Sequence, residues 1–122
     1  MYQQDWMMRQ IQMLVQFVAK LFWGKDFIEY QIEDDNHLSQ TDCLYKDLKV
    51  LLENRELCKA EDLLFEHLEK DNQDYLKLAI DFYQSINELD DPELEAANFS
   101  REEIKSGLDE IMRVFGLPPF AV

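Results

Sequence analysis

The chain has 122 residues, with 12 basic and 26 acidic side chains, two cysteines, three glycines and three prolines. This length predicts one domain spanning residues 1–122 that buries a core of its own. Binding to nucleic-acid phosphates requires a basic patch, so the net charge of −14 predicts no nucleic-acid binding. Glycine and proline are scarce, which disfavours a β-sandwich or barrel and favours an all-α fold.

Residues 2–23 are predicted to form one long helix with a narrow polar stripe. The stripe consists of Asp5, Arg9, Gln12, Gln16 and Lys20, which recur at spacings of three and four. A surface helix buries only about a third of its circumference, whereas almost every other position from Trp6 onward is apolar here. The helix is therefore expected either to form the centre of the core or to be covered by a partner. The residues expected to face that partner are Trp6, Met7, Leu14, Val18, Phe22 and Trp23.

The segment after this helix has a weaker pattern. Gly24 and Lys25 are expected to end or bend the helix, and residues 26–33 fit either a short helix or a short strand. Residues 34–37 are predicted to form a polar loop. Helices are then expected at residues 39–54, 56–70 and 73–89, with a helical turn at 91–97 and a last helix that begins after Ser100.

Several residues indicate where these helices begin, end and pack. Ser39 is expected to cap the second helix, and Asp91 to cap the helical turn that contains Pro92. Ser100 and Glu103 have the spacing of a capping box. The remaining predictions are that Gly107 permits close helix packing, that Gly116 follows the end of the last helix, and that Pro118 and Pro119 prevent its continuation. The short connections predict a compact bundle of five to seven antiparallel helices.

Residues 48–72 resemble a tetratricopeptide repeat. Ala60 matches the small residue of the repeat, and Leu57 and Leu64 match its large neighbours. Leu48 and His67 depart from the pattern, because the repeat prefers small residues at their positions. Stacked repeats need about three units, so the resemblance implies a single TPR-like hairpin within a bundle, and any amphipathic hairpin would also fit.

A second resemblance covers most of the chain. The stretches at residues 8–11 and 17–25, with the helices that follow, resemble a family of small, acidic, helical bacterial proteins of unknown function. This resemblance implies a bacterial cytosolic protein. It implies no catalytic residue.

No constellation of residues predicts a catalytic, cofactor-binding or metal site. His37 lies among aspartates in a polar loop, which favours a solvated loop over a metal site. Cys58 lacks a basic partner, because His67 follows nine positions later on another helical face. Cys43 and Cys58 do not form a CxxC motif, so we expect reduced thiols in a cytosolic protein.

The function predicted from the sequence is therefore protein–protein interaction without enzymatic activity. We expect a homodimer formed through the first helix, with pathway and other partners unknown. The alternative is a peripheral membrane protein that docks through residues 6–25. Membrane binding is less favoured, because the remainder of the chain is acidic and would be repelled by anionic lipid. Gln12, Gln16 and Lys20 interrupt the longest apolar stretch, so we predict no membrane-spanning helix. We also predict no signal peptide, because little positive charge precedes this stretch and it does not end at a small-residue cleavage site.

Overall fold

The computed structural model describes the backbone of residues 2–117 and the side chains of residues 6–117. Within this range the chain forms six helices and no strand, which confirms the predicted all-α bundle. The helices are α1 (Tyr2–Trp23), α2 (Gln40–Glu53), α3 (Leu57–His67), α4 (Gln73–Asn87), α5 (Asp91–Ala96) and α6 (Arg101–Val114). Pro118 and Pro119 lie outside the described residues.

Side-chain caps set the start of several helices. Ser39 caps α2 in a capping box with Asp42, and Ser100 caps α6 in a second box with Glu103. In each box the serine accepts a hydrogen bond from the third helical N–H, and the acidic side chain accepts one from the cap N–H. Both starts confirm the predictions from the sequence. Gly116, with φ of 74°, follows α6 as predicted.

The cap of α5 differs from the prediction by one residue. Asp90, not Asp91, is the N-cap, and Glu93 closes the capping box. The physical reason is the spacing, because a capping box needs an acidic or amide side chain three positions after the cap. Glu93 stands at that distance from Asp90, whereas Leu94 stands at that distance from Asp91. The prediction that Asp91 caps this helix was therefore wrong.

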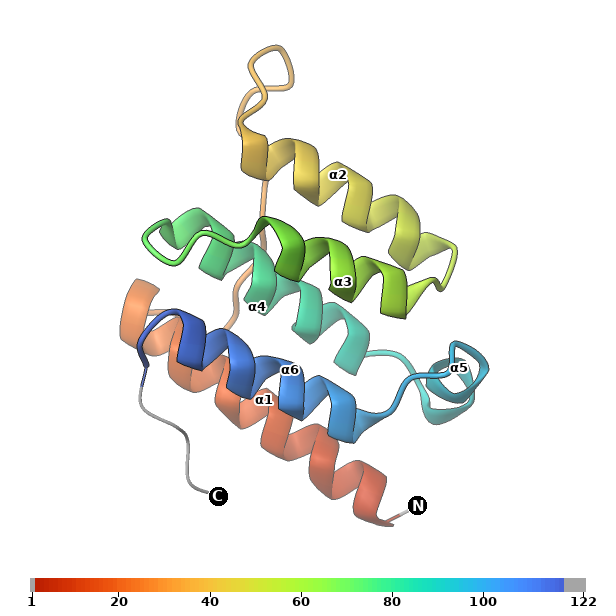
Figure 1. Ribbon diagram of the computed structural model, residues 1–122. Helices are drawn as coiled ribbons and strands as arrows, with labels where there is room; N and C mark the ends of the chain where they lie inside the picture. Colours follow the sequence, from red (N-terminus) through yellow and green to blue (C-terminus); the bar gives the residue numbers. More distant parts are fainter. Residues whose placement is uncertain (1, 118–122) are drawn as a thin grey trace.

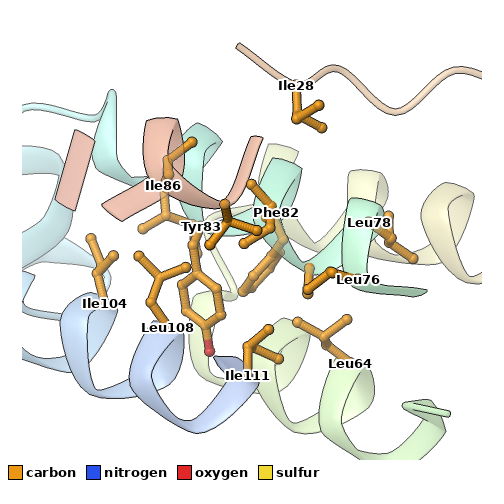
Figure 2. Close-up of a cluster of buried hydrophobic side chains, with 14 of the residues drawn as sticks. Ile28, Leu64, Leu76, Leu78, Phe82, Tyr83, Ile86, Ile104, Leu108 and Ile111 are labelled. Atoms are coloured by element: carbon orange, nitrogen blue, oxygen red, sulfur yellow. The ribbon is translucent and has the colours of Figure 1, made fainter. Parts of the chain in front are cut away.

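The central helix of the bundle is α4, which contacts α1, α2 and α6. Its apolar side chains cover most of its circumference, as expected of a helix buried on several sides. Its buried residues are Tyr75, Leu76, Leu78, Ala79, Ile80, Phe82, Tyr83, Ile86 and Asn87. Figure 2 shows several of them meeting Ile104, Leu108 and Ile111 of α6 and Leu64 of α3. The helices share one hydrophobic core around α4.

The directions of the helices follow from contacts at the end of α4. The Asn87 side chain donates a hydrogen bond to the Met8 carbonyl near the start of α1, at 3.1 Å. Arg101, the first residue of α6, donates to the Asn87 carbonyl at 2.9 Å. Successive long helices from α2 to α6 run antiparallel, while α1 and α6 begin at the same end of α4 and run in the same direction (Figure 1).

The segment between α1 and α2 crosses α4 as an irregular, extended chain (Figure 1). Asp81 Oδ2 accepts a hydrogen bond from the Tyr30 N–H at 3.3 Å, and Gln84 Nε2 donates to the Ile28 carbonyl at 2.6 Å. Ile28 and Tyr30 are buried while Glu29 is exposed, which is the alternation of an extended chain. The segment forms neither the short helix nor the short strand predicted for residues 26–33, because its backbone hydrogen-bonds to side chains of α4.

Candidate interaction surface

A row of exposed apolar side chains runs along α1. Trp6, Met13, Phe17 and Leu21 are 58%, 56%, 41% and 56% exposed. At about 100° per residue they fall within an arc of about 80°, and at about 1.5 Å per residue they extend over about 22 Å. We call these four residues the α1 row. Large apolar side chains that lie together on a surface are typical of interaction sites.

The row is exposed because, in the described part of the chain, the main helix contacts of α1 are with two helices. α1 packs against α4 and α6, which cover one face of the helix. The residues buried on that face are Gln10, Ile11, Leu14, Val15, Val18 and Ala19. The apolar part of α1 is wider than this face, so part of it remains at the surface. α1 is therefore not the hydrophobic centre of the bundle, which was one of the two expectations for it.

The structure corrects the predicted interface at two of its six residues. Leu14 and Val18 are each 1% exposed and lie in the core, because their face of α1 packs against α4 and α6. They are not available to a partner at the surface of the folded chain. Their spacing could not distinguish a face covered by the bundle from a face covered by another chain.

The other predicted interface residues lie at the surface or partly at the surface. Trp6 belongs to the α1 row, and Met7 is half-buried. Phe22 and Trp23 are half-buried and pack against the core, with their ring centroids 5.6 Å apart. The six residues do not form one continuous exposed face.

Sequence reasoning missed Met13, Phe17 and Leu21. A signal was present, because the row adjoins the polar stripe. On a helical wheel Met13 follows Arg9 and Lys20 around the helix, whereas the buried Val18 lies opposite them. Residues beside the polar stripe are farthest from the core, so they are the apolar residues that remain exposed.

The charge around the α1 row differs from that of the whole chain. Residues 6–25 contain Arg9, Lys20 and Lys25 but no aspartate or glutamate, although the whole chain has 26 acidic residues. Lys20 Nζ forms an exposed ion pair with Asp26 at 3.2 Å. The α1 row therefore lies in a neutral to basic region of an acidic protein.

The described residues contain no metal or nucleophile arrangement beside this surface. No group of three or more His, Cys, Asp or Glu side chains among them is placed to hold a metal ion. The two cysteines are not arranged as activated nucleophiles either, and both Cys43 and Cys58 are free and exposed. Desolvation of the Cys58 sulfur by neighbouring atoms, and then the carboxylate of Glu103, raise the pKa of this exposed thiol, which lowers its thiolate fraction and hence its reactivity. His37 Nδ1 donates a hydrogen bond to Asp34 Oδ2 at 2.9 Å.

The fold of the chain is an all-α bundle, and the first helix carries an exposed apolar row. Residues 1–116 match DUF6483, a family of unknown function, so the chain belongs to that family. This confirms the resemblance to a family of unknown function that the sequence predicted. No curated protein and no solved structure matches the chain. Within the described residues, no helix is both long and apolar enough to cross a membrane.

Proposed function

We propose that this protein is a non-enzymatic interaction module that associates with a second copy of itself through the α1 row. The observation that carries the proposal is the row itself, in which Trp6, Met13 and Leu21 are each more than half exposed. A symmetric dimer buries the same surface on both copies, and it is the commonest form of oligomer. One exposed row would thus supply both halves of the contact.

The charge distribution favours a second copy at this surface. Two copies with a net charge of −14 repel each other wherever their acidic surfaces meet. Residues 6–25 have no acidic side chain, so contact through α1 keeps the acidic parts of the two copies apart. An antiparallel contact places Trp6 of one copy near Leu21 of the other. Asp26, paired with Lys20, offsets the repulsion between the basic side chains of the facing helices.

The α2–α3 hairpin supports the same class of function. Ala60 is fully buried in α3, and the two helices pack against each other. A small residue at such a position allows close approach of two helices, as in tetratricopeptide repeats, which serve as binding scaffolds. The two free cysteines are consistent with a protein of the cytosol of a bacterial cell, which is the location we propose.

Docking on a membrane is the second candidate function. Trp6 and Arg9 near the start of α1, and Lys25 just beyond its end, are the residue types that interfacial helices present to anionic lipid. The remainder of the chain opposes this docking, because residues 26–122 contain nearly all of the acidic side chains. We therefore favour the second copy as the occupant of the α1 row.

The mass of the protein in solution tests the proposal. Light scattering after size exclusion is expected to give twice the chain mass of 14.6 kDa for the native protein. The double substitution Met13→Asp and Leu21→Asp is expected to give the monomer mass with an unchanged circular-dichroism spectrum. The matched control is Val50→Asp in α2, because Val50 is 55% exposed on another helix. The control should remain a dimer.

Two results would contradict the proposal. One is a native protein that stays at the monomer mass at concentrations of about 1 mM. The other is a Val50→Asp variant that dissociates as readily as the double variant. Flotation with anionic phosphatidylserine vesicles distinguishes the second candidate, since binding that is abolished by Met13→Asp and Leu21→Asp would assign the row to lipid.

A further inference from the structure

A groove lies on the polar side of α4, between α2 and the segment that contains Phe27. Its volume is about 300 Å³. Leu48, Leu78 and Phe82 are buried residues that line it, and Tyr45 and the exposed Phe27 also line it. Small-molecule sites combine apolar and aromatic walls of this kind with a few polar groups. The groove is separate from the α1 row.

Asp81 lines this groove and is half-buried. Its Oδ2 atom accepts a long hydrogen bond, 3.3 Å from the Tyr30 nitrogen, and the Ser85 side chain also hydrogen-bonds to the carboxylate. None of the ion pairs in the described part of the chain involves Asp81. Lys49 lines the same groove, but its Nζ lies over the Tyr45 ring, 5.6 Å from the centroid. The carboxylate is thus partly desolvated and lacks a cation in direct contact.

The other charged residues of the groove leave an excess of carboxylates. Glu29, Glu53 and Glu88 line it together with Asp81, against the two cations Lys49 and Arg55. Arg55 is already engaged, because its guanidinium pairs with Glu93 at 2.9 Å and donates to the Leu52 carbonyl at 2.8 Å. The electrostatic potential of the groove therefore favours a positively charged occupant.

We propose that this groove binds an organic cation whose ammonium or guanidinium group pairs with Asp81 and whose apolar part lies along Tyr45 and Phe27. A cation beside a partly desolvated carboxylate restores the interactions that burial removed. Aromatic faces also attract cations, which adds to the contact with the apolar part. The volume is at the lower end for ligand sites, so the ligand is a small amine or guanidine. Its source is either a free molecule or the side chain of a basic residue in a peptide.

A chemical-shift titration of the folded protein near pH 8 tests the site. The probes are benzylamine, 1,4-diaminobutane and N-acetylarginine amide, with benzyl alcohol as the uncharged control. The amines are expected to produce saturable shifts at the amides of Lys49, Gln84 and Ser85, and the alcohol none. Tighter binding of the arginine derivative than of both free amines would identify a basic side chain as the source.

Substitutions separate a specific site from general attraction to an acidic protein. Asp81→Asn is expected to weaken binding about tenfold, while Asp62→Asn, which removes the same charge from an exposed position on α3, leaves it unchanged. Ser85→Leu fills the groove and keeps the carboxylate, while it also removes the hydrogen bond from the Ser85 side chain to Asp81. It is expected to abolish binding, so the test does not depend on one variant. Protonation of Asp81 should also weaken binding near pH 5.

The proposal is overturned if the amines produce no saturable shifts up to about 50 mM, or if Asp81→Asn and Asp62→Asn weaken binding equally. It is also overturned if Ser85→Leu leaves binding intact. None of these results bears on self-association, because the groove and the α1 row share no residue.

Discussion

Gly107 of α6 lies directly against the phenol ring of Tyr83 in α4. A Cβ atom at position 107 would stand 2.1 Å from Tyr83 Oη and 2.4 Å from Cζ, far closer than atoms can pack. Tyr83 is fully buried, and its hydroxyl donates a hydrogen bond to Glu61 Oε2 at 2.5 Å. The hydroxyl end of the ring is thus fixed between Glu61 of α3 and the backbone of α6 at Gly107. The two helices approach closely at the position where α6 has no side chain, which confirms the packing role predicted for Gly107.

Gly107→Ala is therefore expected to destabilise the fold. Alanine favours a helix over glycine by about 1 kcal/mol, but overpacking of a core costs about 1–3 kcal/mol. Because Tyr83 cannot move away without losing its bond to Glu61, we expect a net loss of about 1–2 kcal/mol in the free energy of unfolding, measured by urea denaturation. Ser106→Ala, at the exposed neighbouring position, is the control. A Gly107→Ala variant as stable as the native protein would show that the ring shifts at no cost.

Arg101 joins α6 to the end of α4 and is 2% exposed. Its Nη1 donates to the carbonyl and the side-chain oxygen of Asn87, each at 2.9 Å, and its Nη2 donates to the Leu89 carbonyl at 2.7 Å. Nη2 also pairs with Asp91 at 3.2 Å. The guanidinium thus bonds carbonyl groups that the helix end leaves without intrahelical partners.

Arg101→Met should lower the free energy of unfolding by about 3 kcal/mol, because it leaves buried carbonyl groups without donors. Arg113→Met is the matched control in the same helix, since Arg113 is exposed and pairs with Glu110, three positions earlier on the same helix. That change should cost less than about 1 kcal/mol. Equal effects of the two substitutions in urea denaturation would contradict the capping role of Arg101.

The pH dependence of stability should report on Asp81. Burial raises the pKa of Asp81 to about 6, although the hydrogen bond from the Tyr30 N–H acts in the opposite direction. Between about pH 4 and pH 6 the folded protein therefore holds a proton that the unfolded chain has released. The stabilisation linked to this proton is complete below about pH 4 and is lost as the pH rises through about 6.

Asp81→Asn removes this dependence, because an amide does not titrate and still accepts the bond from Tyr30. We expect the variant to be more stable than the native protein by about 1–2 kcal/mol near pH 8, with little difference near pH 4. Urea denaturation at several pH values measures the difference. A variant that is less stable at every pH would show that the charged carboxylate stabilises the fold.

Two substitutions on α1 distinguish its core from its surface. Val18→Glu places a charge in the core and should unfold the protein, with a loss above about 4 kcal/mol. Met13→Glu, on the exposed row, should change the stability of the monomer by less than about 0.5 kcal/mol. Thermal denaturation monitored by circular dichroism compares them. A folded Val18→Glu variant would mean that the buried face of α1 is not part of the core.

The sequence by itself determined where most helices begin and which of their residues are apolar. Ser39 and Ser100 could be identified as caps because a capping box involves only residues within one turn. The same local rule identifies Asp90 once Glu93 is taken into account. The long α1 helix and the break at Gly24 also follow from periodicity and from backbone preference. The match to a family of unknown function assigns no role to any individual residue.

Only the tertiary structure decided which apolar face meets which neighbour. The periodicity of α1 places Met13 beside the polar stripe and Val18 opposite it, but how much of the wide apolar surface is covered depends on where α4 and α6 lie. Arg101 is buried by groups 10–14 positions away in the chain, and Asp81 is bonded by Tyr30, which is 51 positions away. Helix formation depends on neighbours within about four residues, whereas burial and the environment of a charge depend on helices that pack from distant parts of the chain.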